Sequence, residues 1–351
     1  MAPFFDLQVN GFAGVDFQDP ALSQTGLRRA VDALARHQTG GILLTLITDR
    51  IDAMAAKLAQ IERYRAADPV IAAMVAGYHL EGPHLSALPG YHGAHPRELM
   101  TAPDRAAFDR LQAAAGGHIR LITLAPELPG SPEFIRHITA AGVRTAIGHS
   151  AATDAELDAA IAAGLTLCTH LGNGVPLELP RHDNIIQRLL ARDELTAVFI
   201  ADGLHVPPAV LRNFVRAKPP GKVLFTTDCM AAAGAGPGRY RIGRLEIEVG
   251  GDGIVREPGQ RNFAGSSLTM DRAAANAAAW LGWPAEAVAA ACGAGASRCR
   301  PTAAAPIAPA RPIAMTMARM RHFQRSQTAR RSMNEDKPLV CAKGLKGFQP
   351  V

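Results

Sequence analysis

Apolar and β-branched runs alternate along the chain with segments of helical period. Eight of these runs have the length and composition of buried strands, and polar residues gather toward their last positions. They cover residues 4–10, 41–48, 75–82, 119–127, 143–150, 165–173, 195–203 and 222–230. The segments between them carry apolar residues at helical spacing, as in 27–37, 53–65, 105–115 and 207–217. Strands that alternate with helices predict a (β/α)8 TIM-type barrel, whose active site lies at the carboxyl ends of the strands.

The clearest strand, helix and strand unit covers residues 144–174. Thr153 and Glu156 have the spacing of a capping box, which predicts a helix start between two short strands. The strands end near His149 and His170, and a right-handed crossover places both ends on the same edge of the sheet. We therefore expect the two imidazoles side by side, where they could bind a metal ion. A hydrogen-bonded loop histidine is the alternative for each.

Other polar residues stand at the ends of the predicted strands. Gln8 and Asn10 end the first run, Glu81 the third, and Asp228 lies within the apolar eighth. One glutamate and two histidines form a catalytic type of ligand set, which leaves a coordination position for water. Taken alone, Glu81 could instead cap a helix or form an ion pair in its Glu-Gly-Pro loop. An acid at Asp228 costs free energy unless it is paired or bound.

Seven sequence blocks, in this order, resemble the N-acetylglucosamine-6-phosphate deacetylase family of the amidohydrolase superfamily. The resemblance runs from about Asp6 to Gly282. The blocks are LQVNGFAGVDF, HLEGPHLS with GAH after it, GHSAAT, THLGNGVP, IADGLHV, TTDCMAAAG with PGRYRIG, and FAGSSLTMD. Seven blocks in the family's order are much stronger evidence than any single motif.

The resemblance implies a role for each matched residue. Glu81, His149 and His170 would be the metal ligands. Asp228 would be the catalytic acid and base, and His95 would contact the substrate near its carbonyl group. The substrate-binding residues implied are Ala94, His95, Asn173, Gly174, Arg181, His205, Phe263, Ala264 and Gly265.

The first strand bears on the number of metal ions. Many superfamily members carry His-x-His there and bind two metals, whereas this chain has Gln8-Val9-Asn10. We therefore expect one divalent metal ion per chain, Zn²⁺. Such an ion lowers the pKa of its bound water toward ~7 and so supplies a nucleophile at neutral pH.

The function implied by the resemblance is hydrolysis of N-acetyl-D-glucosamine 6-phosphate to D-glucosamine 6-phosphate and acetate. One alternative is a deacetylase for a related N-acyl amino sugar, such as N-acetylgalactosamine 6-phosphate. Another is a catalytically impaired barrel with a basic binding tail. The expected partners are a small amino sugar phosphate and a second copy of the chain in a homodimer.

Composition excludes several other classes of protein. The 351 residues are 48% hydrophobic, enough for a large core, but there is no signal-peptide pattern and no apolar stretch near 18 residues. We therefore expect neither export nor a membrane span. The five cysteines are odd in number and form no CxxC pair, which favours a reducing cytoplasm over a disulfide framework.

The net charge of +6 is concentrated near the C-terminus. Residues 298–351 hold 11 Lys/Arg and 2 Asp/Glu, a net of +9, so residues 1–297 carry −3. Nucleic-acid binding would rest on this tail, whose basic run has Phe323 as its one aromatic residue, and we do not expect it.

Two domains are expected. Residues 1–291 would form the barrel, with a β-hairpin inserted at about 238–258. Residues 292–351, rich in Pro, Ala and Arg, would be a disordered tail or the product of a shifted reading frame. The small β-sandwich domain of the family would be largely missing.

Overall fold

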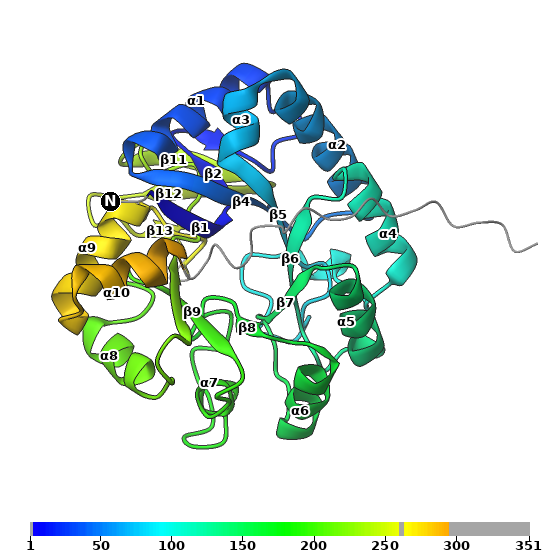
Figure 1. Cartoon of the computed structure of the whole chain (residues 1–351), viewed down its shortest axis with the longest axis vertical. Coiled ribbons are helices and arrows are strands. Elements are labelled where there is room, and N and C mark those ends of the chain that lie inside the picture. Colours follow the sequence, from blue (N-terminus) through cyan, green and yellow to red (C-terminus); the bar gives the residue numbers. More distant parts are fainter. Residues whose placement is uncertain (1–2, 260–262, 295–351) are drawn as a thin grey trace, which may run out of the picture. The chain divides into compact units, whose positions relative to one another are not determined.

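Eight parallel strands form the central sheet (Figure 1). The computed structural model describes residues 3–259 and 263–294. Each strand pairs in parallel with the next one along the chain. The strands are β1 (Phe4–Val9), β4 (Thr39–Ile47), β5 (Val75–Glu81), β6 (Ile119–Leu124), β7 (Arg144–Ile147), β8 (Leu167–Cys168), β9 (Thr196–Ile200) and β10 (Val223–Thr226).

The first and last strands of this sheet meet. An isolated parallel bridge joins Val9 to Cys229, and the backbone N–H of Asn10 donates to the Cys229 carbonyl at 2.7 Å. The sheet therefore closes on itself at its carboxyl end. The predicted (β/α)8 TIM-type barrel is confirmed.

Helices form an outer ring around the strands (Figure 1). The capping box predicted at Thr153 and Glu156 is present at the start of one of them, because each side chain accepts a hydrogen bond from the other residue's backbone N–H. The helices are α1 (Gln24–Arg36), α2 (Ile51–Ala67), α3 (Pro69–Met74), α4 (Arg105–Ala114), α5 (Ser131–Ala140), α6 (Asp154–Ala163), α7 (Ile185–Leu190), α8 (Pro208–Arg216), α9 (Met270–Leu281) and α10 (Ala285–Ala289), with a 3₁₀ turn at Arg97–Leu99 and a π-helical turn at Ala290–Ala294.

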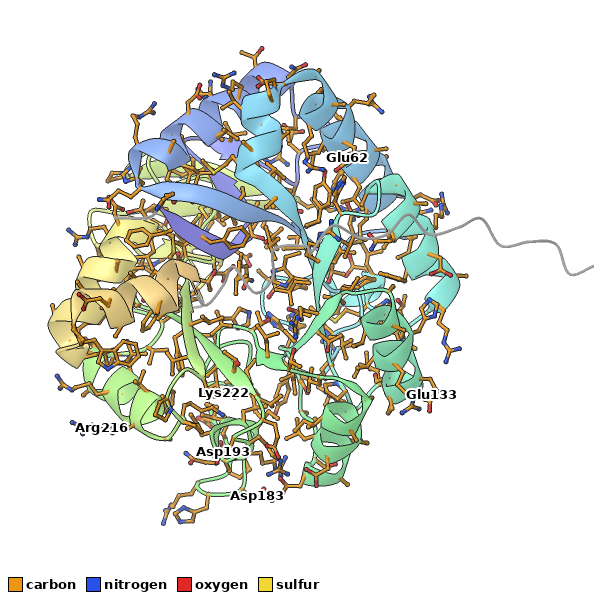
Figure 2. All side chains as sticks on the ribbon, in the orientation of Figure 1. Glu62, Glu133, Asp183, Asp193, Arg216 and Lys222 are labelled. Carbon is orange, nitrogen blue, oxygen red and sulfur yellow. The ribbon has the colours of Figure 1, made fainter. Side chains whose placement is uncertain are left out.

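The core has two main layers. The larger packs the outer faces of the strands against the helices and buries residues such as Leu44, Phe134 and Phe199. A smaller layer takes apolar side chains from the strands around the sheet and fills the barrel. Its members are Phe5, Leu7, Leu43, Leu121, Ala146, Leu167, Val198 and Leu224. Charged side chains such as Glu133 and Asp183 lie at the outer edge instead (Figure 2).

Two short antiparallel sheets accompany the barrel. One pairs β2 (Gly11–Phe12) with β3 (Val15–Asp16). The other contains β11 (Gly238–Ile242), β12 (Leu245–Val249) and β13 (Val255–Arg256). It lies within residues 238–258, for which an inserted β-hairpin is predicted. This second sheet follows β10, so its connections lie on the side of the barrel where the strands end.

Several expectations concern residues that are not described. Residues 295–351 lie outside the described part of the chain, so the expected tail stays a prediction. Cys292, the first residue of the expected 292–351 tail, lies within the described residues and is buried. Across residues 3–259 and 263–294, no helix is both long and apolar enough to cross a lipid bilayer.

Candidate metal and active site

The carboxylate of Glu81, the last residue of β5, is surrounded by three imidazoles. His170 Nε2 lies 2.9 Å from Glu81 Oε1, and His149 Nε2 lies 3.5 Å from the same oxygen. His95 Nε2 lies 3.6 Å from Glu81 Oε2. All four side chains are buried. The loop after β5 and the ends of β7 and β8 thus bring three histidines to one carboxylate, as the strand ends of a barrel allow.

Three of the residues at this end of the barrel have left-handed backbone conformations. The φ angles are 53° at His149, 30° at His170 and 49° at Asp228. Each residue stands two positions after the end of its strand, where the chain turns away from the sheet. Non-glycine residues rarely adopt positive φ, and such conformations concentrate at functional sites.

The second ring nitrogen of each histidine fixes how the ring can act. His149 Nδ1 lies 2.7 Å from the Tyr91 carbonyl oxygen, which can only accept, so the proton is on Nδ1 and Nε2 has a free lone pair. His95 Nδ1 lies 2.9 Å from Thr48 Oγ1 and accepts the Thr48 backbone N–H at 3.4 Å, which places the proton on Nε2. His170 Nδ1 is buried and has no hydrogen-bond partner within the described residues.

The electrostatics of the cluster favour an ionised Glu81. Burial alone would raise the pKa of Glu81, but the hydrogen bond from His170 and the neighbouring imidazoles of His149 and His95 hold that pKa well below its usual value. Burial lowers the pKa of His149 to about 4, which keeps this imidazole neutral. Burial opposes a charge on His170 as well, but its hydrogen bond to Glu81 raises its pKa.

Asp228 lines the same cavity as Glu81 and the three histidines. Desolvation by burial, and then the negative charge of Glu81, raise the pKa of Asp228 to about 7. The Asn10 amide donates a hydrogen bond to Asp228 Oδ1 at 2.8 Å, which opposes that rise. A carboxylate whose pKa is close to 7 can both accept and return a proton near neutral pH.

These donors fit a metal ion. Ligand atoms of Glu81, His95 and His149 all lie within 4.8 Å of one another, and His170 Nε2 contacts the same carboxylate. Imidazole nitrogens with one carboxylate oxygen suit Zn²⁺ and similar transition metals, and a buried carboxylate needs a cation to offset its desolvation. The part of the chain that the structure describes can therefore hold a metal ion here.

A cavity of about 850 Å³ opens above the cluster. Its lining includes all five residues predicted as metal ligands or catalytic groups: Glu81, His95, His149, His170 and Asp228. Six further predicted substrate-binding residues line it as well: Ala94, Asn173, Gly174, His205, Phe263 and Gly265. Arg181 lies on an exposed loop between β8 and α7, and Ala264 is buried, and neither lines the cavity.

Several residues of this region were missing from the sequence-based set. Thr48 follows β4 and hydrogen-bonds His95, and a polar residue at a strand end could have drawn attention to it. Ile242 and Glu257 come from the segment that holds the β11 to β13 sheet and line the cavity. Their place could have been inferred, because an insertion after the last strand begins on the side where the strands end.

The closed barrel and its carboxylate and imidazole cluster define a class of protein, the metal-dependent amidohydrolases. Comparison with known proteins shows to which family within that class the chain belongs. An N-acetylglucosamine-6-phosphate deacetylase of Bos taurus is 38% identical over 284 residues, which are 77% of this chain and 67% of the bovine protein. This chain belongs to the N-acetylglucosamine-6-phosphate deacetylase family.

Two further amino sugar phosphate deacetylases are similar to this chain over most of its length. An N-acetylgalactosamine-6-phosphate deacetylase of Escherichia coli O157:H7 is 34% identical over 291 residues, covering 81% of this chain and 74% of the relative. A mutant N-acetyl-D-glucosamine-6-phosphate deacetylase of Mycobacterium smegmatis, solved in complex with N-acetyl-D-glucosamine-6-phosphate, has a TM-score of 0.77 and 33% identity, covering 85% of this chain and 77% of that one. No protein-family model matches the chain.

Proposed function

We propose that this protein hydrolyses N-acetyl-D-glucosamine 6-phosphate to D-glucosamine 6-phosphate and acetate. One observation carries the proposal: Glu81, the three imidazoles around its carboxylate and Asp228 all line one cavity of about 850 Å³. Such a cavity has the size of a typical small-molecule site. The bovine relative and the mycobacterial complex name the substrate.

We further propose that Glu81, His149 and His170 hold one divalent ion, Zn²⁺. His149 supports this because its Nδ1 proton is held by the Tyr91 carbonyl, which leaves Nε2 free as a ligand. Amides rather than imidazoles at the end of the first strand favour one ion over two. When bound, the ion would lower the pKa of its water toward ~7 and polarise the substrate carbonyl.

His95 has a different role in this proposal. Its Nδ1 accepts the Thr48 backbone N–H, so Nε2 carries the proton and points toward the carboxylate cluster. An Nε2–H group can donate a hydrogen bond to the oxygen that becomes negative when water adds to the acetamide carbon. We therefore assign His95 to the stabilisation of that oxyanion rather than to the metal.

Asp228 would move the proton. As the water oxygen forms its bond to the carbonyl carbon, a carboxylate oxygen of Asp228 takes the water proton. When the C–N bond breaks, the protonated carboxyl returns the same proton to the sugar nitrogen. The products are acetate and the 2-amino sugar phosphate, and Asp228 ends the cycle as it began.

The remaining predicted residues would bind the sugar phosphate. His205 is oriented by Asp202, whose Oδ2 lies 2.6 Å from His205 Nδ1, and its ring lies 4.7 Å from that of Phe263. This contact leaves His205 Nε2 available to the ligand. Arg181, on the exposed loop between β8 and α7, offers a planar guanidinium group that could bind the phosphate. Ala94, Asn173, Gly174, Ala264 and Gly265 complete the proposed set.

An amino sugar epimer is the second candidate substrate. The Escherichia coli O157:H7 relative is named for N-acetylgalactosamine 6-phosphate and is 34% identical to this chain over 291 residues. The catalytic groups act on the acetamide in either case, so the epimers differ only in their contacts with the cavity wall. Homodimer formation and a cytoplasmic location stay predictions.

The proposal is tested on one preparation of the full chain. Elemental analysis should find about one metal ion per chain, and acetate should be released from N-acetylglucosamine 6-phosphate. The same assay with N-acetylgalactosamine 6-phosphate decides between the epimers. A preparation that binds its metal ion but releases acetate from neither sugar phosphate would overturn the proposed function.

A further inference from the structure

Asn10 bonds to Asp228 from a fixed place on the barrel wall. Its backbone N–H donates to the Cys229 carbonyl at 2.7 Å, and its own carbonyl accepts from Phe17 N–H at 3.0 Å. The bridge between Val9 and Cys229 holds the neighbouring residues of both strands together. Only 2% of Asn10 is exposed, so its side chain has little freedom to turn elsewhere.

The Asn10 amide bonds to one of the two Asp228 oxygens. Its Nδ2 donates to Asp228 Oδ1 at 2.8 Å, and among the described residues this is the only hydrogen bond to that carboxylate. A carboxylate only accepts, which fixes the orientation of the amide. Asp228 Oδ2 has no hydrogen-bond partner among the described residues, and Asp228 lines the cavity.

The amide oxygen of Asn10 and the position of Asn10 in the cavity also bear on its role. Asn10 Oδ1 is buried and has no hydrogen-bond partner within the described residues, although a buried polar atom usually has one. The unpaired oxygen costs free energy, and the contact that this orientation of the amide preserves is the hydrogen bond from Nδ2 to Asp228. Asn10 also lines the cavity, whereas Gln8, two residues earlier on β1, does not.

We propose that Asn10 is a positioning residue that holds Asp228 Oδ1 so that Oδ2 faces the reacting water. The inference rests on the proposed function, because it concerns the carboxylate that moves the proton. A side chain free to rotate would spend part of its time with neither oxygen near the water. The hydrogen bond removes that freedom before the substrate arrives.

The test compares Asn10→Leu with Gln8→Leu as a matched control. Gln8 is also 2% exposed on the same strand, and its side-chain nitrogen has no hydrogen-bond partner in the described part of the chain. We expect Asn10→Leu to lower kcat about 10- to 100-fold, as loss of a supporting hydrogen bond usually does. KM and metal content should stay near the wild-type values, and Gln8→Leu should retain its kcat.

A double-mutant cycle separates positioning from a structural role. In an Asp228→Ala background, Asn10→Leu should change the residual rate by less than about twofold, since no carboxylate remains to be positioned. An equal loss in both backgrounds would overturn the inference. A fall in kcat that merely follows a fall in metal content would do the same. Asn10→Ala repeats the cycle if the leucine variant does not fold.

Crystal structures of the variants keep the two proposals distinguishable. In Asn10→Leu crystals the Asp228 side chain should adopt a new or mixed orientation, and in Gln8→Leu crystals it should not. An unchanged Asp228 in Asn10→Leu would overturn the positioning role whether or not the chain is a deacetylase. An inactive wild-type chain would overturn the proposed function alone.

Discussion

Asp6 Oδ2 accepts a hydrogen bond from Thr227 Oγ1 at 2.5 Å, although 221 residues separate them along the chain. Asp6 Oδ1 accepts three more, from Thr226 Oγ1 at 2.5 Å, from Thr227 N–H at 3.1 Å and from Gln8 N–H at 3.3 Å. Asp6 lies on β1, and Thr226 ends β10. A single carboxyl group therefore joins the first and last strands of the barrel in the region below the site.

Replacing Asp6 by alanine should destabilise the fold. The substitution removes the acceptor of two buried hydroxyls and of two backbone N–H groups, and each such loss costs about 1–3 kcal/mol. We expect Asp6→Ala to lower the free energy of unfolding by about 3 kcal/mol or more in urea denaturation. Asp193→Ala is the control, because Asp193 is exposed (Figure 2) and should change stability by less than about 0.5 kcal/mol. Equal stability of the two variants would contradict the proposed role of Asp6 in joining β1 to β10.

Two alanine variants decide which histidines bind the metal. Ligand atoms of Glu81, His95 and His149 lie within 4.8 Å of one another, yet the hydrogen bonds of His95 place its proton on Nε2. We expect His170→Ala to lose most of its metal ion, measured by elemental analysis after dialysis. His95→Ala should keep its metal ion and lose kcat by about 100-fold or more. The reverse pattern would show that His95 is the ligand.

Asp228→Asn should separate metal binding from turnover. Asparagine keeps the shape of the side chain but cannot take a proton from water, so kcat should fall by several orders of magnitude at unchanged metal content. Elemental analysis and acetate release measure the two properties on the same sample. Asp193→Asn serves as the matched surface control. Normal turnover by Asp228→Asn would remove the proposed proton transfer.

The sequence indicates most of the barrel because its elements are local. The capping box of Thr153 and Glu156 acts within one turn of helix, and the paired ends at His149 and His170 follow from the handedness of a single crossover. Glu81 and Asp228 are recognisable because acids at the ends of apolar strands need a partner.

The contacts that orient these groups could not be predicted in the same way. His149 is held by the Tyr91 carbonyl, a backbone atom 58 residues away that no side-chain pattern reveals. Thr48 reaches His95 across 47 residues, from a strand end to a loop. Such pairs depend on how loops fold above the barrel, and the periodicity of strands and helices contains no information about loop conformation.

Asp16 should give the stability of the protein a measurable dependence on pH. Desolvation by burial raises the pKa of Asp16 from 3.8 to about 6, against hydrogen bonds from the backbone N–H groups of Gln18 and Gly243. The folded state therefore binds this proton more tightly than the unfolded state does. The stability that Asp16 contributes is complete below about pH 4 and is lost as pH rises through about 6.

The variant Asp16→Asn removes that titration. Relative to wild type, it should gain on the order of 2 kcal/mol in free energy of unfolding between pH 4 and pH 7, because each pKa unit is worth about 1.4 kcal/mol. Urea denaturation at a series of pH values measures the difference in free energy of unfolding between the variant and the wild type. The contributions of the other titrating groups are the same in both proteins and cancel in that difference. Parallel pH curves for the two proteins would mean that Asp16 has an ordinary pKa.

His205 and Arg181 should act on the phosphate rather than on the chemistry. The Asp202 carboxylate holds His205 at the cavity wall, whereas Arg181 lies on an exposed loop outside it. We expect His205→Ala and Arg181→Ala each to raise KM for N-acetylglucosamine 6-phosphate by about tenfold or more at nearly constant kcat. A residue that binds substrate and transition state equally well changes KM in this way.

Unphosphorylated N-acetylglucosamine provides the control for both variants. It lacks the group that these residues are proposed to hold, so the wild type and the variants should hydrolyse it with similar, low kcat/KM. A loss for both substrates would assign His205 to the sugar or to the acetamide instead. Arg181→Ala with an unchanged KM for the phosphorylated sugar would remove Arg181 from the site, and the phosphate would then have to be held by the residues that line the cavity.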